Sequence, residues 1–495
     1  MSKFADLVKE LKEKIFGKEE PKIDSLQSLS LQSDKSPPAA SKRVARLAPS
    51  RSHPYFVQIG FDFGTAFSKC ICRDVMTNKA WVHIPANPAD RELPFLIPST
   101  LRIDNGRLQH LGKTGVYYPG NGLYHLKQAL EKVAMRQWDA PDLAPYRRVI
   151  GYSDAADLAR LVEAGAVYYL AGALGEVRLQ VRQRLPGFGD LPDDYMAVNL
   201  AVPVADAERP AVNALYQQIL CRAWVLADHL AGYPVISVDE MVSLMADSQC
   251  CKNQSVSDAC YIYPEVSANV QGFVRSRASS EGIYLFSDAG AGTVDQSVFI
   301  FTRTEHKEQL AYLHGNILPI GSSCIERYAA ETSGETDWKQ LEYWRELKER
   351  GTNNLALEEA RDKLDQELNR GTTATLALAK RKLFCPQQLR EIRVIFGGGG
   401  HCERPYKSGV MASFAGNIFS PSLHPDEVGL PTPVDLELTA SEKRWLRRLS
   451  VAYGLSFVRE ELARFIFPVD IQPPKPDELW RPQFLPPDAP TNDDC

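Results

Sequence analysis

The clearest pattern in this chain is a pair of apolar runs joined by a short turn of small and acidic residues. It occupies residues 282–301, GIYLFSDAGAGTVDQSVFIF. We call residues 288–295 the second glycine turn, and its polar and small positions are Asp288, Gly290, Ala291, Gly292, Thr293 and Asp295. Apolar runs that flank a glycine-rich turn predict two antiparallel strands. The second of these strands ends near Phe301.

The same pattern occurs earlier, in residues 58–69, QIGFDFGTAFSK. Here an apolar run again meets an aspartate, a glycine and a threonine. We call residues 62–66 the first glycine turn, and its key positions are Asp62, Gly64, Thr65 and Ala66. A third stretch, VIFGGGG at residues 394–400, predicts a strand that runs into what we call the glycine loop, Gly397 to Gly400.

The remaining periodicity predicts alternating strands and helices. Further strands are expected at 79–84, 195–204, 312–320 and 391–396, and a strand followed by a helix at 235–245. Asp104-Asn105-Gly106 is a typical hairpin turn. Helices are expected at 123–137, 155–185, 206–230, much of 326–383 and 449–467. Residues 249–280 are less regular than the rest of this region.

Residues 2–17 predict an amphipathic helix with one apolar face, formed by Phe4, Leu7, Val8, Leu11 and Ile15. Residues 18–53 are rich in Ser, Pro, Lys and Gln and predict a flexible linker. A helix this short needs a surface on which to bury its apolar face. We expect that surface to belong to a partner protein or a second copy of the chain; the chain's own core or a membrane remain alternatives. Residues 468–495 form a Pro-rich tail.

Composition narrows the function classes. The chain has 495 residues, 44% of them hydrophobic and 24% charged, and a net charge of −5, so it carries no basic footprint for nucleic acid. No apolar run reaches the roughly 20 residues needed to span a bilayer. The N-terminus shows no signal-peptide pattern, so we expect a cytoplasmic protein. Scattered cysteines fit reduced thiols. The spacing of Cys250, Cys251 and Cys260 matches no standard metal site, which leaves a metal site there open.

The glycine turns predict a phosphate site. Glycines let backbone N–H groups approach an anion closely and adopt φ > 0. Carboxylates beside such turns suit Mg²⁺ bound next to phosphates, so Asp62 and Asp288 are candidate metal residues, largely through water. The alternatives are an ordinary β-hairpin and aspartates that only cap turns.

The three glycine motifs, in this order, resemble those of the superfamily of actin-like ATPases and sugar kinases. Within it, the chain is most similar to the nucleotide-binding domain of DnaK-type heat-shock chaperones, over residues 55–467. This resemblance implies an α/β, two-lobed actin-like fold with duplicated βββαβα halves and inserted small lobes. Lobe I is expected at 54–250 and lobe II at 278–467. Since few residues follow 468, we expect no peptide-binding domain.

The resemblance also implies roles for individual residues with ATP or ADP and Mg²⁺ as cofactors. Residues implied to contact the phosphates are Gly64, Thr65, Ala66, Gly290, Ala291, Gly292 and Gly321. Residues implied to contact the nucleoside are Lys348, Gly397, Gly398 and Gly399. Residues implied in catalysis are Lys127, which offsets charge on the γ-phosphate, Glu240, which orients water, and Asp288, Thr293 and Asp295. The bland alternatives are a solvated lysine at Lys127 or Lys348 and a helix N-terminal carboxylate at Glu240.

Several positions depart from the family pattern. Ala66 replaces a hydroxyl residue, and Ala291 replaces the middle glycine of the second turn. The sequence after Gly400 is His-Cys-Glu-Arg, and an acidic residue expected before residues 452–454 is absent, with Arg447 and Arg448 nearby. These departures favour nucleotide binding over fast hydrolysis.

We therefore expect an ATPase that binds ATP–Mg²⁺, hydrolyses it slowly and uses the nucleotide state to change its affinity for a protein partner. Three rivals remain open: a scaffold that binds nucleotide with little turnover, a small-molecule kinase, and a filament-forming actin-like protein.

Overall fold

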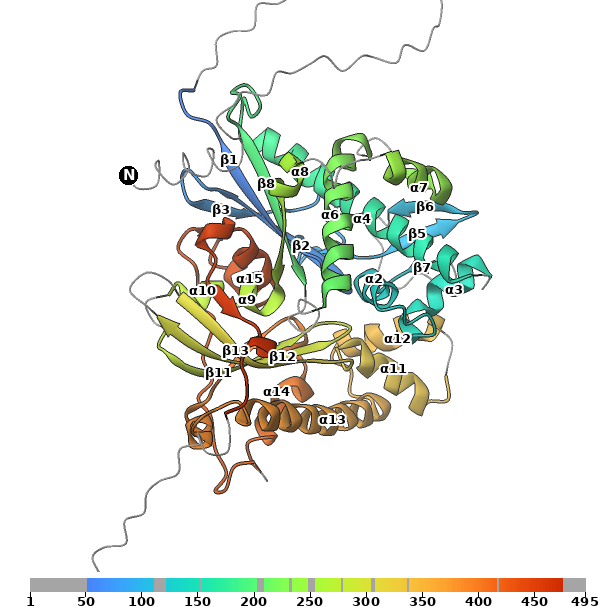
Figure 1. The fold of residues 1–495 in the computed structure, drawn as a ribbon. Coiled ribbons are helices and arrows are strands. Elements are labelled where there is room, and N and C mark those ends of the chain that lie inside the picture. Colours follow the sequence, from blue (N-terminus) through green and yellow to red (C-terminus); the bar gives the residue numbers. More distant parts are fainter. Residues whose placement is uncertain are drawn as a thin grey trace, which may run out of the picture.

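The computed structural model describes residues 51–110, 122–151, 154–202, 209–230, 234–247, 254–276, 279–303, 308–335, 338–415 and 418–474. Over these ranges the chain is a mixed α/β structure with three sheets (Figure 1). The expected helix at 2–17, nearly all of the linker, Cys250, Cys251 and most of the Pro-rich tail lie outside them. Within the described ranges, no helix has both the length and the apolar character needed to cross a membrane.

The first sheet is built on an antiparallel meander of β1 (Phe56–Asp62), β2 (Phe67–Asp74) and β3 (Lys79–Val82). A later strand, β8 (Tyr195–Val202), pairs with β1 in parallel, and β10 (Cys260–Pro264) pairs with β8 in parallel. The strands β1 and β8 are almost wholly buried, as expected for the middle of a sheet covered on both faces. Two short strands, β4 (Ile97–Pro98) and β15 (Leu436–Glu437), extend the sheet.

The second sheet repeats this plan. Its meander consists of β11 (Gly282–Ala289), β12 (Val294–Arg303) and β13 (Glu308–Leu318). A later strand, β14 (Arg393–Gly397), pairs with β11 in parallel, as β8 does with β1. A short strand, β16 (Arg464–Ile466), adds to β13. Each half therefore places a glycine turn between its first two strands and a parallel strand beside the first.

The first half carries an inserted small sheet of β7 (Gly122–Leu123), β5 (Leu101–Asp104), β6 (Arg107–His110) and β9 (Val235–Ser237). The predicted hairpin turn is confirmed, because Asn105 and Gly106 join β5 to β6 with φ of 47° and 71°. The helices of this half are α2 (Leu126–Ala134), α3 (Ala144–Ile150), α4 (Ala155–Arg184), α6 (Pro210–Leu230), α7 (Val238–Asp247) and α8 (Gln254–Ala259).

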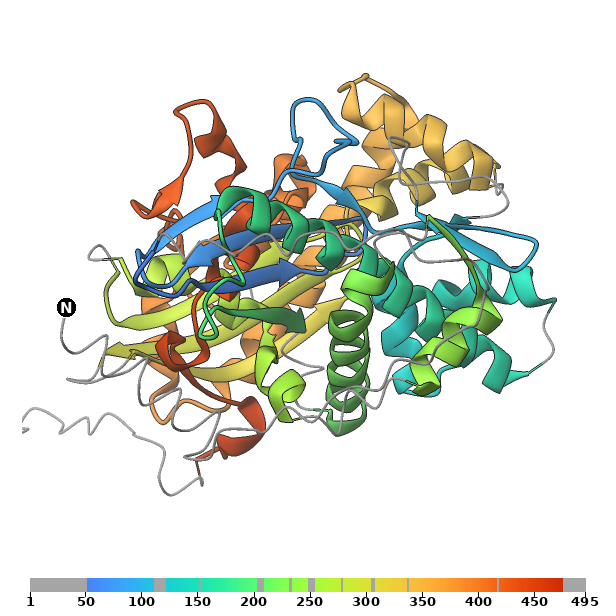
Figure 2. The same ribbon diagram turned by 90° about the horizontal axis from the view of Figure 1, so that it is seen from above.

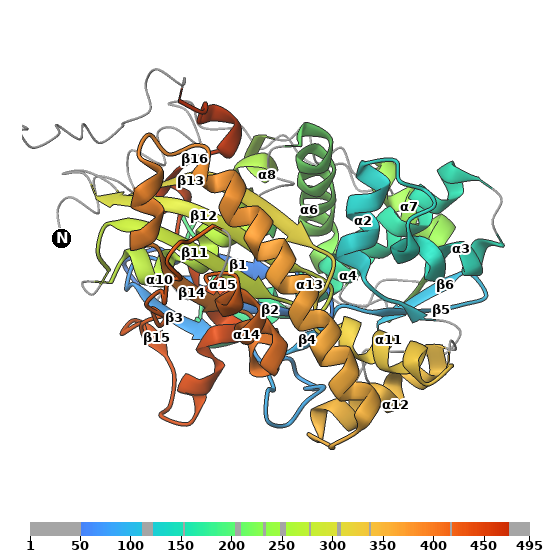
Figure 3. The same ribbon diagram turned by 90° about the horizontal axis from the view of Figure 1, so that it is seen from below.

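In the second half, the expected helical stretch is confirmed in outline. It divides into α11 (Ser323–Thr332), α12 (Trp338–Glu349) and α13 (Leu355–Lys380), and α14 (Arg404–Ala412) follows the glycine loop. The long helix α13 lies across one face of the second sheet, as Figure 3 shows. Asn354 caps it by accepting hydrogen bonds from the backbone of Ala356 and Leu357.

Helix α15 (Leu446–Leu455) lies between the two sheets (Figures 1 and 2). Its backbone contacts the first half directly, because a side chain at Gly60 in β1 would collide with the carbonyl of Ala452. On its other side Gly454 packs against the backbone of Ala268. Only glycine permits such close backbone approach.

One expectation about these segments is wrong. The helix expected over 449–467 ends at Leu455, because the buried Asn199 side chain donates hydrogen bonds to the carbonyls of Leu455 and Phe457, each at 2.8 Å. Residues 249–280, expected to be less regular, contain β10 and three short helices, α8, α9 (Glu265–Asn269) and α10 (Gln271–Val274). Since β10 belongs to the first sheet, that half extends beyond residue 250.

Candidate functional site

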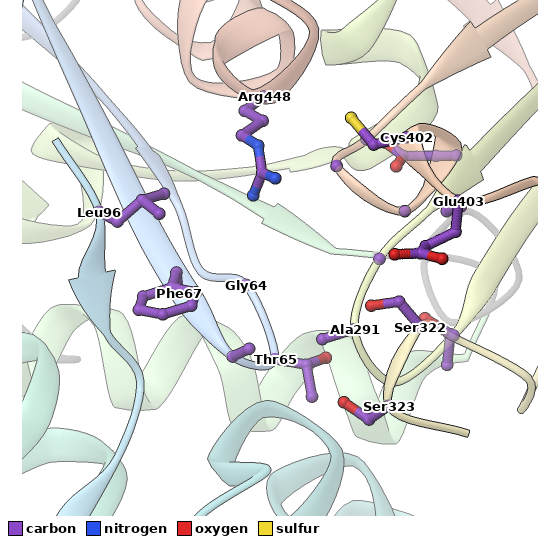
Figure 4. A pocket seen from close by; sticks show the side chains of 18 of the residues that line it. Gly64, Thr65, Phe67, Leu96, Ala291, Ser322, Ser323, Cys402, Glu403 and Arg448 are labelled. Atoms are coloured by element: carbon purple, nitrogen blue, oxygen red, sulfur yellow. The ribbon is translucent and has the colours of Figure 1, made fainter. Parts of the chain in front are cut away.

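The two glycine turns and the glycine loop meet at one cleft between the halves. It has a volume of about 200 Å³ and is walled by residues from both glycine turns, the glycine loop, α12 and α15 (Figure 4). Of the residues predicted for the site, those that line this cleft are Asp62, Gly64, Thr65, Ala66, Lys127, Asp288, Gly290, Ala291, Thr293, Asp295, Lys348, Gly398 and Gly399. The structure therefore brings most of the residues predicted for the site together in one cleft, from motifs more than 300 positions apart.

The first glycine turn places Asp62 at the end of β1, where it is 2% exposed. Its Oδ2 accepts a hydrogen bond from Lys69 Nζ at 2.7 Å, while its Oδ1 is buried without a partner. Gly64 has no room for a side chain, because a Cβ there would collide with the carbonyl of Phe67. The turn is therefore compact and leaves one carboxylate oxygen available.

The second glycine turn is fixed by backbone hydrogen bonds. Gly290 N donates to Thr293 O at 2.9 Å, which closes the turn. The backbone N–H groups of Ser322 and Ser323, at the start of α11, donate to the carbonyls of Gly290 and Ala291, each at 2.9 Å. Gly321 packs so closely on this turn that it admits no side chain. The turn is thus held in one shape before any ligand arrives.

Two carboxylates of β11 and β12 lie directly opposite each other, because Asp288 and Asp295 are register partners. Burial, with Glu265 and Asp62 nearby, raises the pKa of Asp288 to about 7. Burial and Glu265 also raise the pKa of Asp295 well above its ordinary value. Asn269 donates a hydrogen bond to Asp288, and Thr293 Oγ1 donates one to Asp295 at 3.0 Å. Both carboxylates therefore hold their protons more tightly than exposed aspartates do.

Lys127, on α2, reaches the same cleft and forms an ion pair with Glu265 at 2.6 Å. Burial alone would lower the pKa of this lysine, but Glu265, Asp295 and Asp62 outweigh burial and raise it. Glu265 is the first residue of α9, directly after the buried strand β10. The lysine is therefore a permanent positive charge among carboxylates.

Glu240, the residue expected to orient water, is not part of this site. It is exposed on α7, beside the small inserted sheet, and does not line the cleft. A glutamate that does reach the cleft, beside Lys127, is Glu265, which the sequence analysis missed. The available signal was the short apolar strand YIYP that ends directly before Glu265.

Three other predicted glycines stand behind the cleft wall instead of lining it. Gly292 packs against the side-chain amide of Gln128, Gly321 supports the second glycine turn, and Gly397 faces Phe286 and Asn269 inside β14. Gly398 adopts φ of 80°, and a side chain there would collide with Asp288 Oδ1. The glycine loop therefore enters the cleft from Gly398 onward.

Lys348 lines the cleft but is already engaged. Its Nζ lies 2.6 Å from Glu326 Oε1 and donates to the carbonyl of Ser322 at 3.3 Å. This pair joins α12 to the start of α11, next to the second glycine turn. Lys348 is therefore a buried link between helices at the edge of the cleft as well as a wall residue.

The carboxylates fit a hydrated cation better than a directly ligated one. Within the part of the chain that the structure describes, no three His, Cys, Asp or Glu side chains converge as direct metal ligands. However, Asp62 Oδ1 and Asp295 Oδ1 are both buried without a hydrogen-bond partner. Buried carboxylate oxygens without partners are costly, and water molecules of a hydrated Mg²⁺ would satisfy them.

No protein-family model matches the chain, and no curated protein matches its sequence.

Proposed function

We propose that this protein is a two-lobed, actin-like ATPase, similar to the nucleotide-binding domain of DnaK-type chaperones, which binds ATP with Mg²⁺ and hydrolyses it slowly. In this proposal the nucleotide state changes how the halves close and thereby the affinity for a protein partner. The proposal rests on the residues of the cleft and on the repeated plan of the two sheets.

One observation carries the proposal. Two hairpins of the same topology end in glycine turns that face each other across a single cleft, and each contributes an aspartate from its first strand, Asp62 and Asp288. A triphosphate between them would be contacted by backbone N–H groups from both halves. The glycine loop, after the parallel strand β14, borders the same cleft and suits a nucleoside.

The charges between the two glycine turns, a part of the cleft that we call the turn end, favour a cation beside the phosphates. The turn end is lined by four carboxylates, Asp62, Glu265, Asp288 and Asp295, and by two lysines, Lys69 and Lys127. A Mg²⁺ ion held through water by Asp62, Asp288 and Asp295 would supply charge neutralisation for a phosphoryl group. The same ion would lower the pKa values of Asp288 and Asp295, because a nearby positive charge favours the ionised form.

The chain's own residues then divide the remaining tasks. Lys127 offers a fixed positive charge where negative charge develops on the terminal phosphate. Glu265 accepts a hydrogen bond and can orient a water molecule or take its proton. In the ligand-free cleft the two neutralise each other, so both roles require the ligand to separate them.

The test is calorimetry of the full chain with Mg²⁺–ATP up to millimolar concentration. Binding is expected, and Asp288→Asn should weaken it in the presence of Mg²⁺ while changing it little in EDTA. The control is Glu240→Gln, which removes an exposed carboxylate outside the cleft. Absence of nucleotide binding by the wild-type protein would refute the proposal.

A second candidate is a scaffold that binds nucleotide with little turnover. The observation that favours it is the direct Lys127–Glu265 ion pair, which keeps the would-be base bound to a lysine. Tight Mg²⁺–ATP binding without phosphate release would support this candidate over the ATPase.

A further inference from the structure

The cationic side chains of the cleft differ in whether they have partners. Six line it within the described chain: Lys69, Lys127, Arg345, Lys348, Arg447 and Arg448. Four of them form ion pairs with cleft carboxylates, namely Lys69 with Asp62 at 2.7 Å, Lys127 with Glu265 at 2.6 Å, Lys348 with Glu326 at 2.6 Å and Arg345 with Glu349 at 2.8 Å. The two that remain are neighbours in the sequence.

Arg447 and Arg448 lie in the first turn of α15. Neither guanidinium makes a hydrogen bond or an ion pair with any residue that the structure describes. Figure 4 shows the Arg448 side chain pointing into the cavity, across from Thr65 and Ser323. Its guanidinium packs against Gly399, where a Cβ would approach Arg448 Cζ to 2.8 Å. Arg448 therefore belongs to the glycine-loop end of the cleft.

This arrangement attracts an anion. Arg447 is exposed and Arg448 is half-buried, so water solvates both guanidinium groups in the empty protein. Two adjacent cations nevertheless repel each other, and the first turn of a helix favours negative charge because of the helix dipole. No carboxylate of the described residues pairs with either arginine, and Glu403, which also lines the cleft, pairs with Arg361 of α13 at 3.1 Å instead. An anionic ligand group at this end would offset the repulsion.

The two ends of the cleft thus attract ligand groups of opposite charge. The turn end has buried carboxylate oxygens without partners, which fit a hydrated cation beside phosphates. The glycine-loop end has two guanidinium groups without partners, and arginine binds phosphate through two parallel N–H···O bonds. A ligand that satisfies both ends carries phosphate at each of them.

We propose that the preferred ligand is a nucleotide with a second phosphorylated position, on the 2′ or 3′ oxygen of its ribose, bound by Arg448 with support from Arg447. This inference rests on the proposed nucleotide binding and adds a specificity to it. The 5′ phosphates lie at the glycine turns, and the ribose phosphate lies at the start of α15.

A different use of the same arginine is stacking. A guanidinium is planar and can lie flat on a purine base, which needs no second phosphate. The two uses predict different effects of replacing the arginine by lysine. Lysine keeps the charge but not the plane, so it preserves phosphate binding and not stacking.

The test compares ADP with adenosine 3′-phosphate 5′-diphosphate and with its 2′-phosphate isomer, by calorimetry on the full chain with Mg²⁺. One charge-assisted contact that is partly exposed predicts about tenfold tighter binding of at least one isomer than of ADP. Arg448→Gln should abolish this preference, Arg448→Lys should retain most of it, and the preference should weaken as salt rises. The matched control is Arg345→Gln, an arginine of the same cleft that is already paired with Glu349.

The outcomes separate this inference from the proposed nucleotide binding on which it rests. Binding of ADP with no preference for either bisphosphate would overturn the inference and leave nucleotide binding intact. Equal weakening of all three ligands by both Arg448 variants would assign the arginine to stacking and also overturn it. If no nucleotide binds, both the proposed function and this specificity are refuted.

Discussion

Lys127 and Glu265 form an ion pair of 2.6 Å in the wall of the cleft, although 138 positions separate them in the sequence. The pair joins α2 of the first half to α9, which directly follows β10, an edge strand of the first sheet. Because both side chains are largely buried, each is the main compensation for the other's charge. Whatever enters the cleft must either fit beside this pair or replace one of its members.

The first prediction concerns Glu265 in hydrolysis. Glu265→Gln keeps the size of the side chain but removes its ability to accept a proton, so phosphate release should slow by about tenfold or more, as expected for a lost general base. ATP affinity should change little. Single-turnover phosphate release measures the rate, and Glu240→Gln is the matched control. Slow phosphate release by Glu240→Gln, together with a normal rate for Glu265→Gln, would show that the water-orienting carboxylate had been misassigned.

The second prediction concerns pH. The folded protein raises the pKa of Asp288 from 3.8 to about 7, so between these values the folded state binds more protons than the unfolded state. Asp288 therefore lowers the free energy of unfolding of the ligand-free protein as pH rises from about 4 to about 7, whereas buried histidines with lowered pKa values, such as His110 and His401, act with the opposite sign. Asp288→Asn should remove the Asp288 contribution from the pH slope, while Asp295 still contributes with the same sign as Asp288. Urea titrations at several pH values measure it, and an unchanged slope in the variant would contradict the assignment.

The third prediction concerns Gly398. Its φ of 80° is strained for any other residue, and a Cβ would collide with Asp288 Oδ1. Gly398→Ala should lower the free energy of unfolding by more than the roughly 1 kcal/mol expected from backbone strain alone, and it should weaken Mg²⁺–nucleotide binding.

The matched control for Gly398 is Gly151→Ala. Gly151 has a similar φ of 68°, but open space surrounds the position of its Cβ. It should therefore show the strain cost alone, with normal nucleotide binding. Equal effects of the two substitutions in thermal melting and calorimetry would argue against the contact with Asp288.

The fourth prediction concerns the end of α15. Asn199→Ala removes two buried hydrogen bonds and leaves the carbonyls of Leu455 and Phe457 without their donor. The expected loss is about 2–4 kcal/mol in the free energy of unfolding, measured by urea denaturation. Asn316→Ala, which removes a single partly buried bond to Thr375, should cost less. A loss no larger than that of the control would show that the cap contributes little.

The sequence predicted the local parts of this fold well. The two hairpins were visible because their turns carry glycine and aspartate between apolar runs, and Asn105-Gly106 specifies its own turn. The same motifs brought Asp62, Asp288 and Gly398 into the predicted site. What the sequence did not reveal depends on partners far along the chain.

Glu265 and the end of α15 illustrate this limit. The strand before Glu265 has only five residues and becomes recognisable when it pairs with β8, so its carboxylate was overlooked in favour of Glu240. Residues 449–467 have a helical pattern, yet Asn199 from β8 ends the helix at Leu455. In both cases a contact distant in sequence overrides the local preference.

Helix α15 begins at the arginine pair and lies with bare backbone against β1, because Gly60 provides no side chain between them. On its opposite side Gly454 meets the backbone of Ala268 in α9, the helix that starts with Glu265. Closely packed backbone has little compressibility, so a displacement of Arg448 would move α15 as a rigid body. In the proposed function, a ligand group that moves Arg448 would therefore also move Glu265, the carboxylate proposed to orient water, through directly packed backbone.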